Sequence, residues 1–461
     1  MSLIVRINVL ILLICTEFIL SSTVLANDPF ATEDLIEHGR LDQTFEEGHC
    51  SKDKILAPLS LANVVDLALC NNPQTRALWG NARAQAAQVG VSSAAYLPTL
   101  SALGNVSNNQ YKAGNQPQTN SLSQTASLSI NYLLYDFGGR SATLENARQL
   151  LIAANASRDA TLQSNFLNAV QAYYALLSAR ASVESFKVDE LKAQESLAAA
   201  QARYQAGVAT PVDRLQAQTT LSQAKLNRIR SEGEAGNAQG TLANIMGFDA
   251  PQQYTLQSVA EVTPDPVIER DIGKLIAEAR QKRPDLAAAE SQIKAAEAQL
   301  QAANATGRPT ITLGAMAGIT NPDIQSSSLG ITLSVPLFSG FKTTYQARAA
   351  EAQIESRVAE RDRLANQIAL DVWKAYQGLL TNSQALRSAE DLVLAATQSE
   401  KMILGRYKAG VGNILDTLSA QSALANARQQ RVAALYNFLT SRFTLAQAIG
   451  QLDLTQFSSG N

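Results

Sequence analysis

The chain has 461 residues, and its 38 Lys and Arg nearly balance 40 Asp and Glu, for a formal net charge of −2. No basic excess is available to neutralise phosphates, which argues against a nucleic-acid-binding protein. Apolar residues make up 46% of the chain, enough to bury a core, whereas three Cys and two His are too few for a Cys/His metal cluster.

Residues 1–26 have the pattern of a secretory signal peptide. Arg6 precedes an apolar run at 7–15, and the small residue Ala26 fits cleavage after it. The run is too short to span a bilayer, and a retained membrane anchor is the alternative. Beyond it no stretch of about 18 consecutive apolar residues occurs, so the sequence predicts no further transmembrane helix.

Two cysteines remain once the signal peptide is removed. Cys50 lies in a polar segment, 27–58, and Cys70 lies in the first expected helix. In an oxidising compartment an isolated pair of this kind is a disulfide candidate. The bond would tie the polar segment to the helix, and two unpaired thiols are the alternative.

The rest of the chain contains an internal repeat. The copies occupy 59–250 and 271–450, with a linker at 251–270 between them and a tail at 451–461 after them. The motif Arg203-Tyr204-Gln205-Ala206-Gly207-Val208 recurs as Arg406-Tyr407-Lys408-Ala409-Gly410-Val411, and at the same offset Asp213 matches Asp416 and Gly247 matches Gly450. Chance similarity between Ala-rich helices would not keep one offset through a turn and a final glycine, so we expect two structural repeats.

Each repeat is predicted to begin with a helix and continue into two strands. The helices cover 59–95 and 271–306, and Pro73 and Pro284 interrupt them. Apolar residues then alternate with small or polar ones in four segments of about ten residues, with polar hairpin loops at 107–122 and 320–327. Such alternation after a signal peptide favours strands with lipid on one face and water on the other. A soluble sandwich would give the same alternation.

Very long helices follow the strands. No proline interrupts 139–204 or 342–404, so each segment can form a helix of about 98 Å at 1.5 Å per residue. Apolar residues recur at spacings of three and four, which favours coiled-coil packing. After Gly207 and Gly410 the sequence predicts return helices at 212–245 and 413–449.

Four strands cannot close a membrane barrel on their own. Each unpaired backbone group costs several kcal/mol in hydrocarbon, and closed barrels begin at about eight strands. Two chains would supply eight strands and three would supply twelve. Eight strands leave an interior filled by side chains. The small inward residues favour an open lumen and therefore three chains, whose long helices would form a tube.

In these residues the chain resembles the TolC-like outer-membrane efflux family. The resemblance rests on the repeat, the strand pairs after Pro98 and Pro309, the two Arg-Tyr-x-Ala-Gly-Val turns and the final Leu-Ala-x-x-x-Gly. It implies a mainly α fold with transmembrane β-strands, in which a trimeric 12-strand β-barrel of four strands per chain continues into a long α-helical barrel. It also implies an equatorial belt formed partly by 246–270 and the carboxyl terminus.

The resemblance further implies a passive export channel in the outer membrane. Its partners would be outer-membrane lipid, a periplasmic adaptor and an inner-membrane pump of the ABC or RND type. The segment from Leu59 to Pro73 resembles the start of type I secretion members, which favours protein secretion. Efflux of drugs or metals is the alternative, and a periplasmic coiled-coil scaffold is a remote one.

Functional residues are expected at two tip turns, 203–213 and 406–416. In the family these turns touch the adaptor, which here implicates Arg203, Tyr204, Gly207, Arg406, Tyr407 and Gly410. The family's tunnel mouth narrows at acidic rings, and Asp416 falls on one such position, with Asp213 as its repeat equivalent. The next expected acid is Ser419 in this chain, which departs from the pattern.

Simpler roles are open for the same residues. Asp213 and Asp416 suit the first turn of a helix, where the dipole favours a negative charge. Arg203 and Arg406 suit a helix end, where they would contact carbonyl groups. An enzyme is not expected, because His38 and His49 have no nucleophile motif nearby and Gly138-Gly139 lacks the lysine of a phosphate loop. We expect no catalytic residue, cofactor or metal.

Overall fold

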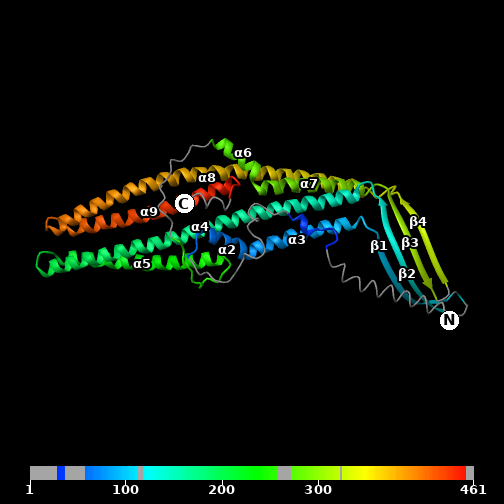
Figure 1. Ribbon diagram of the computed structural model, residues 1–461, viewed down its shortest axis with the longest axis horizontal. Coiled ribbons are helices and arrows are strands. Elements are labelled where there is room, and N and C mark those ends of the chain that lie inside the picture. The colour runs from blue at the N-terminus through cyan, green and yellow to red at the C-terminus, as the bar shows by residue number, and fades with distance from the viewer. Residues whose placement is uncertain are drawn as a thin grey trace. The chain divides into compact units, whose positions relative to one another are not determined.

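The structure is a computed structural model, and it describes residues 28–36, 58–112, 114, 118–257, 271–321 and 324–452. The predicted signal peptide, Cys50, most of the linker and most of the tail lie outside these residues. The elements are η1 (Glu33–Leu35), α2 (Leu61–Asn71), α3 (Pro73–Ala94), β1 (Thr99–Tyr111), β2 (Thr119–Tyr135), α4 (Gly139–Gln205), α5 (Pro211–Ile245), α6 (Ile272–Lys282), α7 (Pro284–Ala305), β3 (Thr310–Thr320), β4 (Ile324–Ser334), α8 (Lys342–Lys408) and α9 (Ile414–Ala448) (Figure 1).

These elements form two compact units. One unit holds the four strands with the parts of α3, α4, α7 and α8 that adjoin them, and the other holds α2, α5, α6, α9 and the remainder of those helices. The order of helix, strand pair, long helix and return helix occurs twice, as the repeat predicts. None of the helices within the described ranges is long and apolar enough to cross a membrane.

The four strands make one antiparallel sheet in the order β1-β2-β3-β4. Leu128 of β2 lies opposite Ala102 on one side and Ala317 on the other, whereas the next residue, Ser129, lies opposite Ser101 and Met316. Side chains alternate between the faces of a sheet, so one face collects apolar residues and the other collects small and polar ones. β1 and β4 are the outer strands.

The strands are longer than the alternation of apolar residues predicts. β1 extends to Tyr111 and β2 begins at Thr119, and three residues separate β3 from β4. Both hairpin loops are therefore shorter than the predicted loops at 107–122 and 320–327. Strand pairing uses backbone groups and continues through polar positions such as Asn108, which lies opposite Leu122. The pairing of β2 with β3 ends at Thr125, so residues 119–123 of β2 pair with β1 alone.

Prolines and caps set the helix limits. Pro73 and Pro284 begin α3 and α7, with a single residue between each proline and the end of α2 or α6, as predicted. Both α4 and α8 have 67 residues, and α8 reaches Lys408, four residues beyond its predicted end. Ser60 and Asn63 form a capping box at the start of α2, which satisfies backbone donors that the first turn leaves free.

The two repeats build matching apolar cores within the helical unit. In the first, Val64, Val65, Ala68 and Leu69 of α2 pack with residues of α4 and α5 such as Phe166 and Leu242. In the second, Leu275 and Ala279 of α6 pack with Ile368 and Val372 of α8 and with Ala448 of α9. Both short helices therefore cover the same part of their long partner.

A glycine lies at the edge of each of these cores, against the end of α2 or α6. Gly247 and Gly450 have φ values of 79° and 72°, and each ends its return helix. A Cβ on Gly247 would lie 2.7 Å from the carbonyl oxygen of Asn71, and one on Gly450 would lie 3.1 Å from that of Lys282. The left-handed backbone and the close approach together require glycine.

Candidate functional site

Both tip turns have the same backbone geometry. The amide of Val208 donates to the carbonyl of Arg203 at 3.0 Å, and Val411 donates to Arg406 at 3.1 Å. With Gly207 at φ 74° and Gly410 at φ 83°, each turn is a Schellman motif that ends a 67-residue helix. The Arg-Tyr-x-Ala-Gly-Val repeat is therefore the sequence of a helix end.

The first turn uses its predicted acid for capping. Thr210 and Asp213 form a capping box, in which the Thr210 amide donates to Asp213 Oδ2 at 2.9 Å and the Asp213 amide donates to Thr210 Oγ1 at 3.3 Å. Tyr204 is 39% exposed, and the guanidinium carbon of Arg214 lies 5.4 Å from the centre of its ring. In this arrangement Asp213 stabilises the start of α5.

The second turn leaves its acid free of capping. Asn413 caps α9 by accepting from the Leu415 amide at 3.0 Å, and Asp416 is exposed in the first helical turn. Ser419, one turn further along α9, is also exposed. Gly412 is needed for the tight turn, because a Cβ there would lie 2.7 Å from the Tyr407 nitrogen. The carboxylate of Asp416 therefore takes no part in capping α9, whereas that of Asp213 caps α5.

Arg203 joins the two tip turns. Its Nη1 donates to the Tyr407 carbonyl at 2.9 Å, and its guanidinium carbon lies 4.8 Å from the centre of the Tyr407 ring. Tyr407 is 5% exposed and packs with Ile414 and Leu418. Its burial raises the pKa of its hydroxyl despite the nearby Arg203 charge. Arg203 is thus a contact between repeats, whereas Arg406 is exposed.

Further polar contacts between the repeats are made by α4 residues that lie N-terminal to Arg203. They are Asp189 with Arg428 at 3.3 Å, Lys192 with Glu400 at 3.1 Å, and Ser196 with Gln421 at 3.1 Å. Burial raises the pKa of Asp189, because the desolvation of its carboxylate outweighs the attraction of Arg428 and Lys192. The spacing of these α4 residues by three, four and seven places them on one face, which is the signal that the sequence analysis missed.

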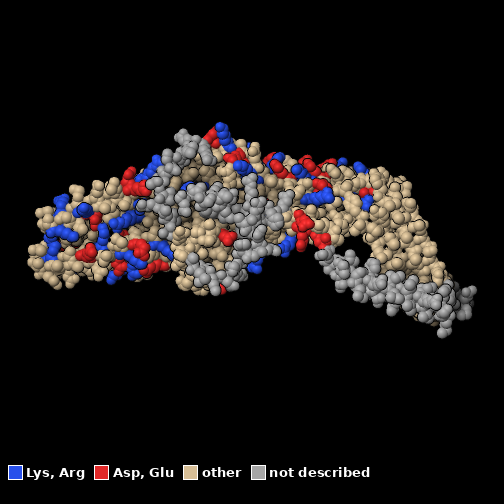
Figure 2. All heavy atoms as spheres, viewed as in Figure 1, with Lys and Arg blue, Asp and Glu red and all other residues tan. Residues whose placement is uncertain are grey.

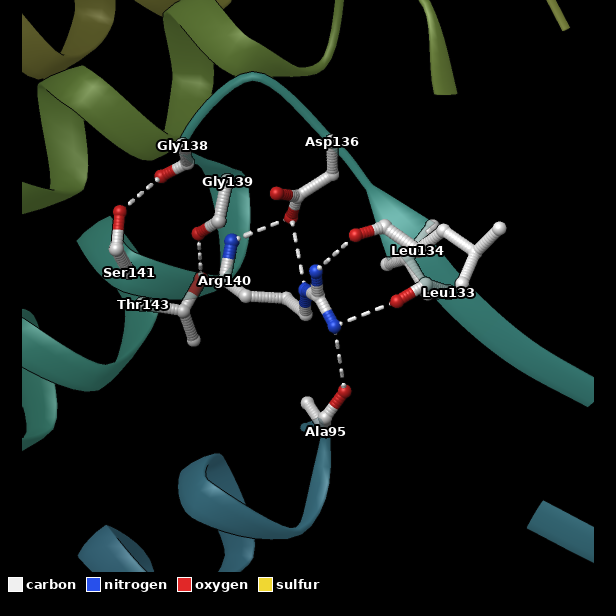
Figure 3. Close-up of polar contacts among 9 residues, drawn as sticks. All are labelled: Ala95, Leu133, Leu134, Asp136, Gly138, Gly139, Arg140, Ser141 and Thr143. Carbon is white, nitrogen blue, oxygen red and sulfur yellow. Dashed lines mark hydrogen bonds and ion pairs between the residues drawn. The ribbon is translucent and has the colours of Figure 1, made fainter. Parts of the chain in front are cut away.

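Arg140 forms a second cluster that the sequence analysis missed, between β2 and α4 (Figure 3). Its backbone amide donates to Asp136 Oδ2 at 2.6 Å, and its guanidinium donates to the carbonyls of Leu133 at 2.7 Å and Leu134 at 3.1 Å. The same group lies 4.8 Å from the centre of the Tyr96 ring. Arg140 thereby connects the end of β2 to the first turn of α4.

Two further predictions concern metals and the cysteines. Within the described residues no group of three His, Cys, Asp or Glu side chains could hold a metal ion. Cys70 is disulfide-bonded. Cys50 lies outside the described residues, so its pairing with Cys70 stays a prediction.

Known proteins resemble the chain over most of its length. Residues 64–248 and 275–451 match a family described as outer membrane efflux protein. The protein CyaE of Bordetella pertussis is 29% identical over 405 residues, which are 86% of this chain and 85% of CyaE. The probable efflux pump outer membrane protein TtgC of Pseudomonas putida is 27% identical over 85% of this chain and 83% of its own. The alkaline protease secretion protein AprF of Pseudomonas aeruginosa is 24% identical over 72% of this chain and 70% of AprF.

Solved structures share the fold. The outer membrane protein VceC of Vibrio cholerae matches with a TM-score of 0.74 at 20% identity, over 85% of this chain and 96% of VceC. The CmeC outer membrane channel of Campylobacter jejuni matches with a TM-score of 0.76 at 18% identity, over 86% of this chain and 88% of CmeC.

Proposed function

The chain belongs to the outer membrane efflux protein family, and from this we propose that three copies form the outer-membrane channel of a tripartite export system. The protein is an outer-membrane channel protein whose helical tunnel lies in the periplasm. It passes substrate passively, and the energy comes from an inner-membrane pump reached through a periplasmic adaptor.

The observation that carries this proposal is the two-faced sheet with outer strands β1 and β4. In hydrocarbon an unpaired strand edge costs several kcal/mol per backbone group. An antiparallel sheet of four strands ends in two strands of opposite direction, so β4 of one copy can pair with β1 of the next and keep the pattern antiparallel. Three copies then close about twelve strands, with the apolar face toward lipid.

We favour type I protein secretion as the pathway. AprF is a secretion protein by its name, and the start of the first repeat resembles type I members. In that case the pump is of the ABC type and the substrate is a protein. Small-molecule efflux with an RND pump is the second candidate, since TtgC is named as an efflux pump component at similar identity.

The tip turns are the proposed adaptor contact and gate. Val208, Val411 and Leu415 are between 47% and 71% exposed there, which leaves an apolar surface for a partner. Arg203 and the polar contacts along α4 hold the two repeats together, and these contacts can exchange with water when the hairpins separate. Apolar contacts between the repeats would resist this separation more strongly, because separation would expose apolar surface to water.

Two measurements test the proposal. The purified full-length protein should form conducting channels in planar bilayers and cross-link as a trimer. In producing cells, a photo-crosslinker at Val411 should capture an adaptor that co-purifies with an ABC transporter, whereas the same probe at Ser107 of β1 should not. A monomer without channel activity would refute the channel, and co-purification with an RND pump would refute type I secretion alone.

A further inference from the structure

The strands carry no charged side chain. In the described strands β1–β4 no residue is Asp, Glu, Lys, Arg or His. Charges resume directly outside them, with Lys112 after β1, Asp136 after β2 and Arg308 two residues before β3. Figure 2 shows the same distribution, since on the face drawn neither acidic nor basic colour appears over the sheet.

One face of this sheet is lined mostly by hydroxyl, amide and glycine groups. The register places Ser127 of β2 between Leu103 and Gly318, and Ser129 between Ser101 and Met316. Ser101 Oγ and Ser129 Oγ lie 2.7 Å apart. The hydroxyl, amide and glycine residues of this face on β2 and β4 include Ser121, Ser123, Thr125, Ser127, Ser129, Asn131, Ser326, Ser328, Gly330, Thr332 and Ser334. Its large apolar members are Leu103, Leu133, Met316 and Ile324, and Tyr111 lies on it at the end of β1.

We propose that the strand-lined part of the pore is neutral toward charge, so that it passes polypeptide segments of either sign and leaves any charge selection to the helical part. The inference rests on the proposed trimeric channel, in which the polar face lines the lumen. Rings of charged side chains give pores ion selectivity, and the described strands contribute no charged side chain to the pore wall. Its hydroxyl and amide groups donate and accept hydrogen bonds without net charge.

Neutrality matters for a long substrate. A secreted polypeptide presents acidic and basic stretches in turn, and a charged ring would hold every stretch of opposite sign. A hydroxyl-lined wall stays wet and treats both signs alike. The strand section thus fits an extended polypeptide of mixed charge as its substrate class.

The test uses channels of the full-length protein in planar bilayers. Oligolysine and oligoglutamate of equal length, added on the strand side, should block the Asp416→Ala channel with dwell times that agree within about twofold, because neither meets an opposite charge in the strands. Blocks of this variant that differ tenfold or more at low salt would overturn the proposal, because charge selection would then not depend on the tunnel mouth.

A pair of neighbouring cysteine variants tests the face assignment after the channel has formed. Ser127→Cys should react with a sulfonate-bearing thiol reagent and shift the potassium-to-chloride permeability ratio at least about threefold toward potassium. A trimethylammonium reagent should shift it equally toward chloride. Leu128→Cys, on the apolar face, should respond to neither, and wild-type protein controls for native cysteines.

The outcomes separate this inference from the proposed channel. A response at Leu128→Cys without one at Ser127→Cys would reverse the face assignment and overturn the neutral wall. Absence of any conductance in the wild-type protein would instead refute the channel itself.

Discussion

Single residues decide where this chain turns. Gly207 and Gly410 end the long helices in left-handed conformation, and Gly247 and Gly450 do the same where the return helices meet α2 and α6. At the first pair there is open space around the missing Cβ, whereas at the second pair a neighbouring backbone fills it. The second pair therefore combines conformational and steric reasons for glycine.

Gly247→Ala should destabilise the protein by about 2 kcal/mol or more, because the new methyl group meets Asn71 while φ stays positive. Gly233→Ala is the matched control. Gly233 lies inside α5 with open space around it, so its replacement should stabilise the helix by about 0.5–1 kcal/mol. Denaturant unfolding of the two variants measures both effects, and equal midpoints would contradict the role given to Gly247.

Arg203→Ala should loosen the contact between the tip turns. It removes a charge-assisted hydrogen bond and a cation–π contact on buried Tyr407, together worth about 1.5–3 kcal/mol. Single-channel recordings should show a higher open probability. Arg406→Ala, at the equivalent but exposed position, should change stability by no more than about 0.5 kcal/mol and leave gating unaltered. If both variants gate alike, the Arg203 contact is not part of the closure.

At the scale of elements, the prolines and glycines in the sequence predicted the limits of the helices better than side-chain chemistry predicted the contacts between them. Pro73, Pro284 and the two tip glycines placed helix limits within a few residues, because each acts on its own backbone. The strand ends were wrong because backbone pairing continues through polar residues. The contact of Arg203 with Tyr407 could not be predicted, since the two residues lie 204 positions apart and only the fold brings them together.

The core around α4 should lose stability in alkali. Burial raises the pKa of Tyr173 and Tyr174 to about 12 from an ordinary value of 10.0. A raised folded-state pKa means that the stabilising effect is complete below pH 10 and is lost as the pH rises from 10 through 12. The loss is at most about 2–3 kcal/mol for each residue. Thermal unfolding between pH 9 and 12 measures it.

Two phenylalanine variants sharpen this test. Tyr174→Phe should flatten the alkaline decline, because it removes a titrating group. Tyr173→Phe should flatten it too but should also lower stability at neutral pH by about 1 kcal/mol, since the Tyr173 hydroxyl donates to the Gln257 carbonyl at 3.1 Å. An unchanged alkaline decline in both variants would show that these hydroxyls do not control it.

At the scale of the whole molecule, symmetry multiplies each exposed charge. In the proposed trimer three copies of Asp416 surround one axis and attract cations to the tunnel mouth. Asp416→Ala should raise single-channel conductance or weaken divalent-cation block about twofold or more. Asp213→Ala is the control, because its carboxylate caps α5 and its loss should cost about 1 kcal/mol of stability without altering the block. No change in either property for Asp416→Ala would remove it from the mouth.

The β1–β2 hairpin is longer than the β3–β4 hairpin and would project from the cell surface in the proposed trimer. The last five residues of β1 and the first five of β2 pair only with each other, about 17 Å beyond the end of β3. An epitope tag inserted after Lys112, which is exposed, should bind antibody on intact bacteria, whereas one after Gln205 at a tip turn should stain only permeabilised cells. In the proposed trimer, a molecule that approaches the bacterium from outside, such as an antibody, would meet three such projections before it met the pore.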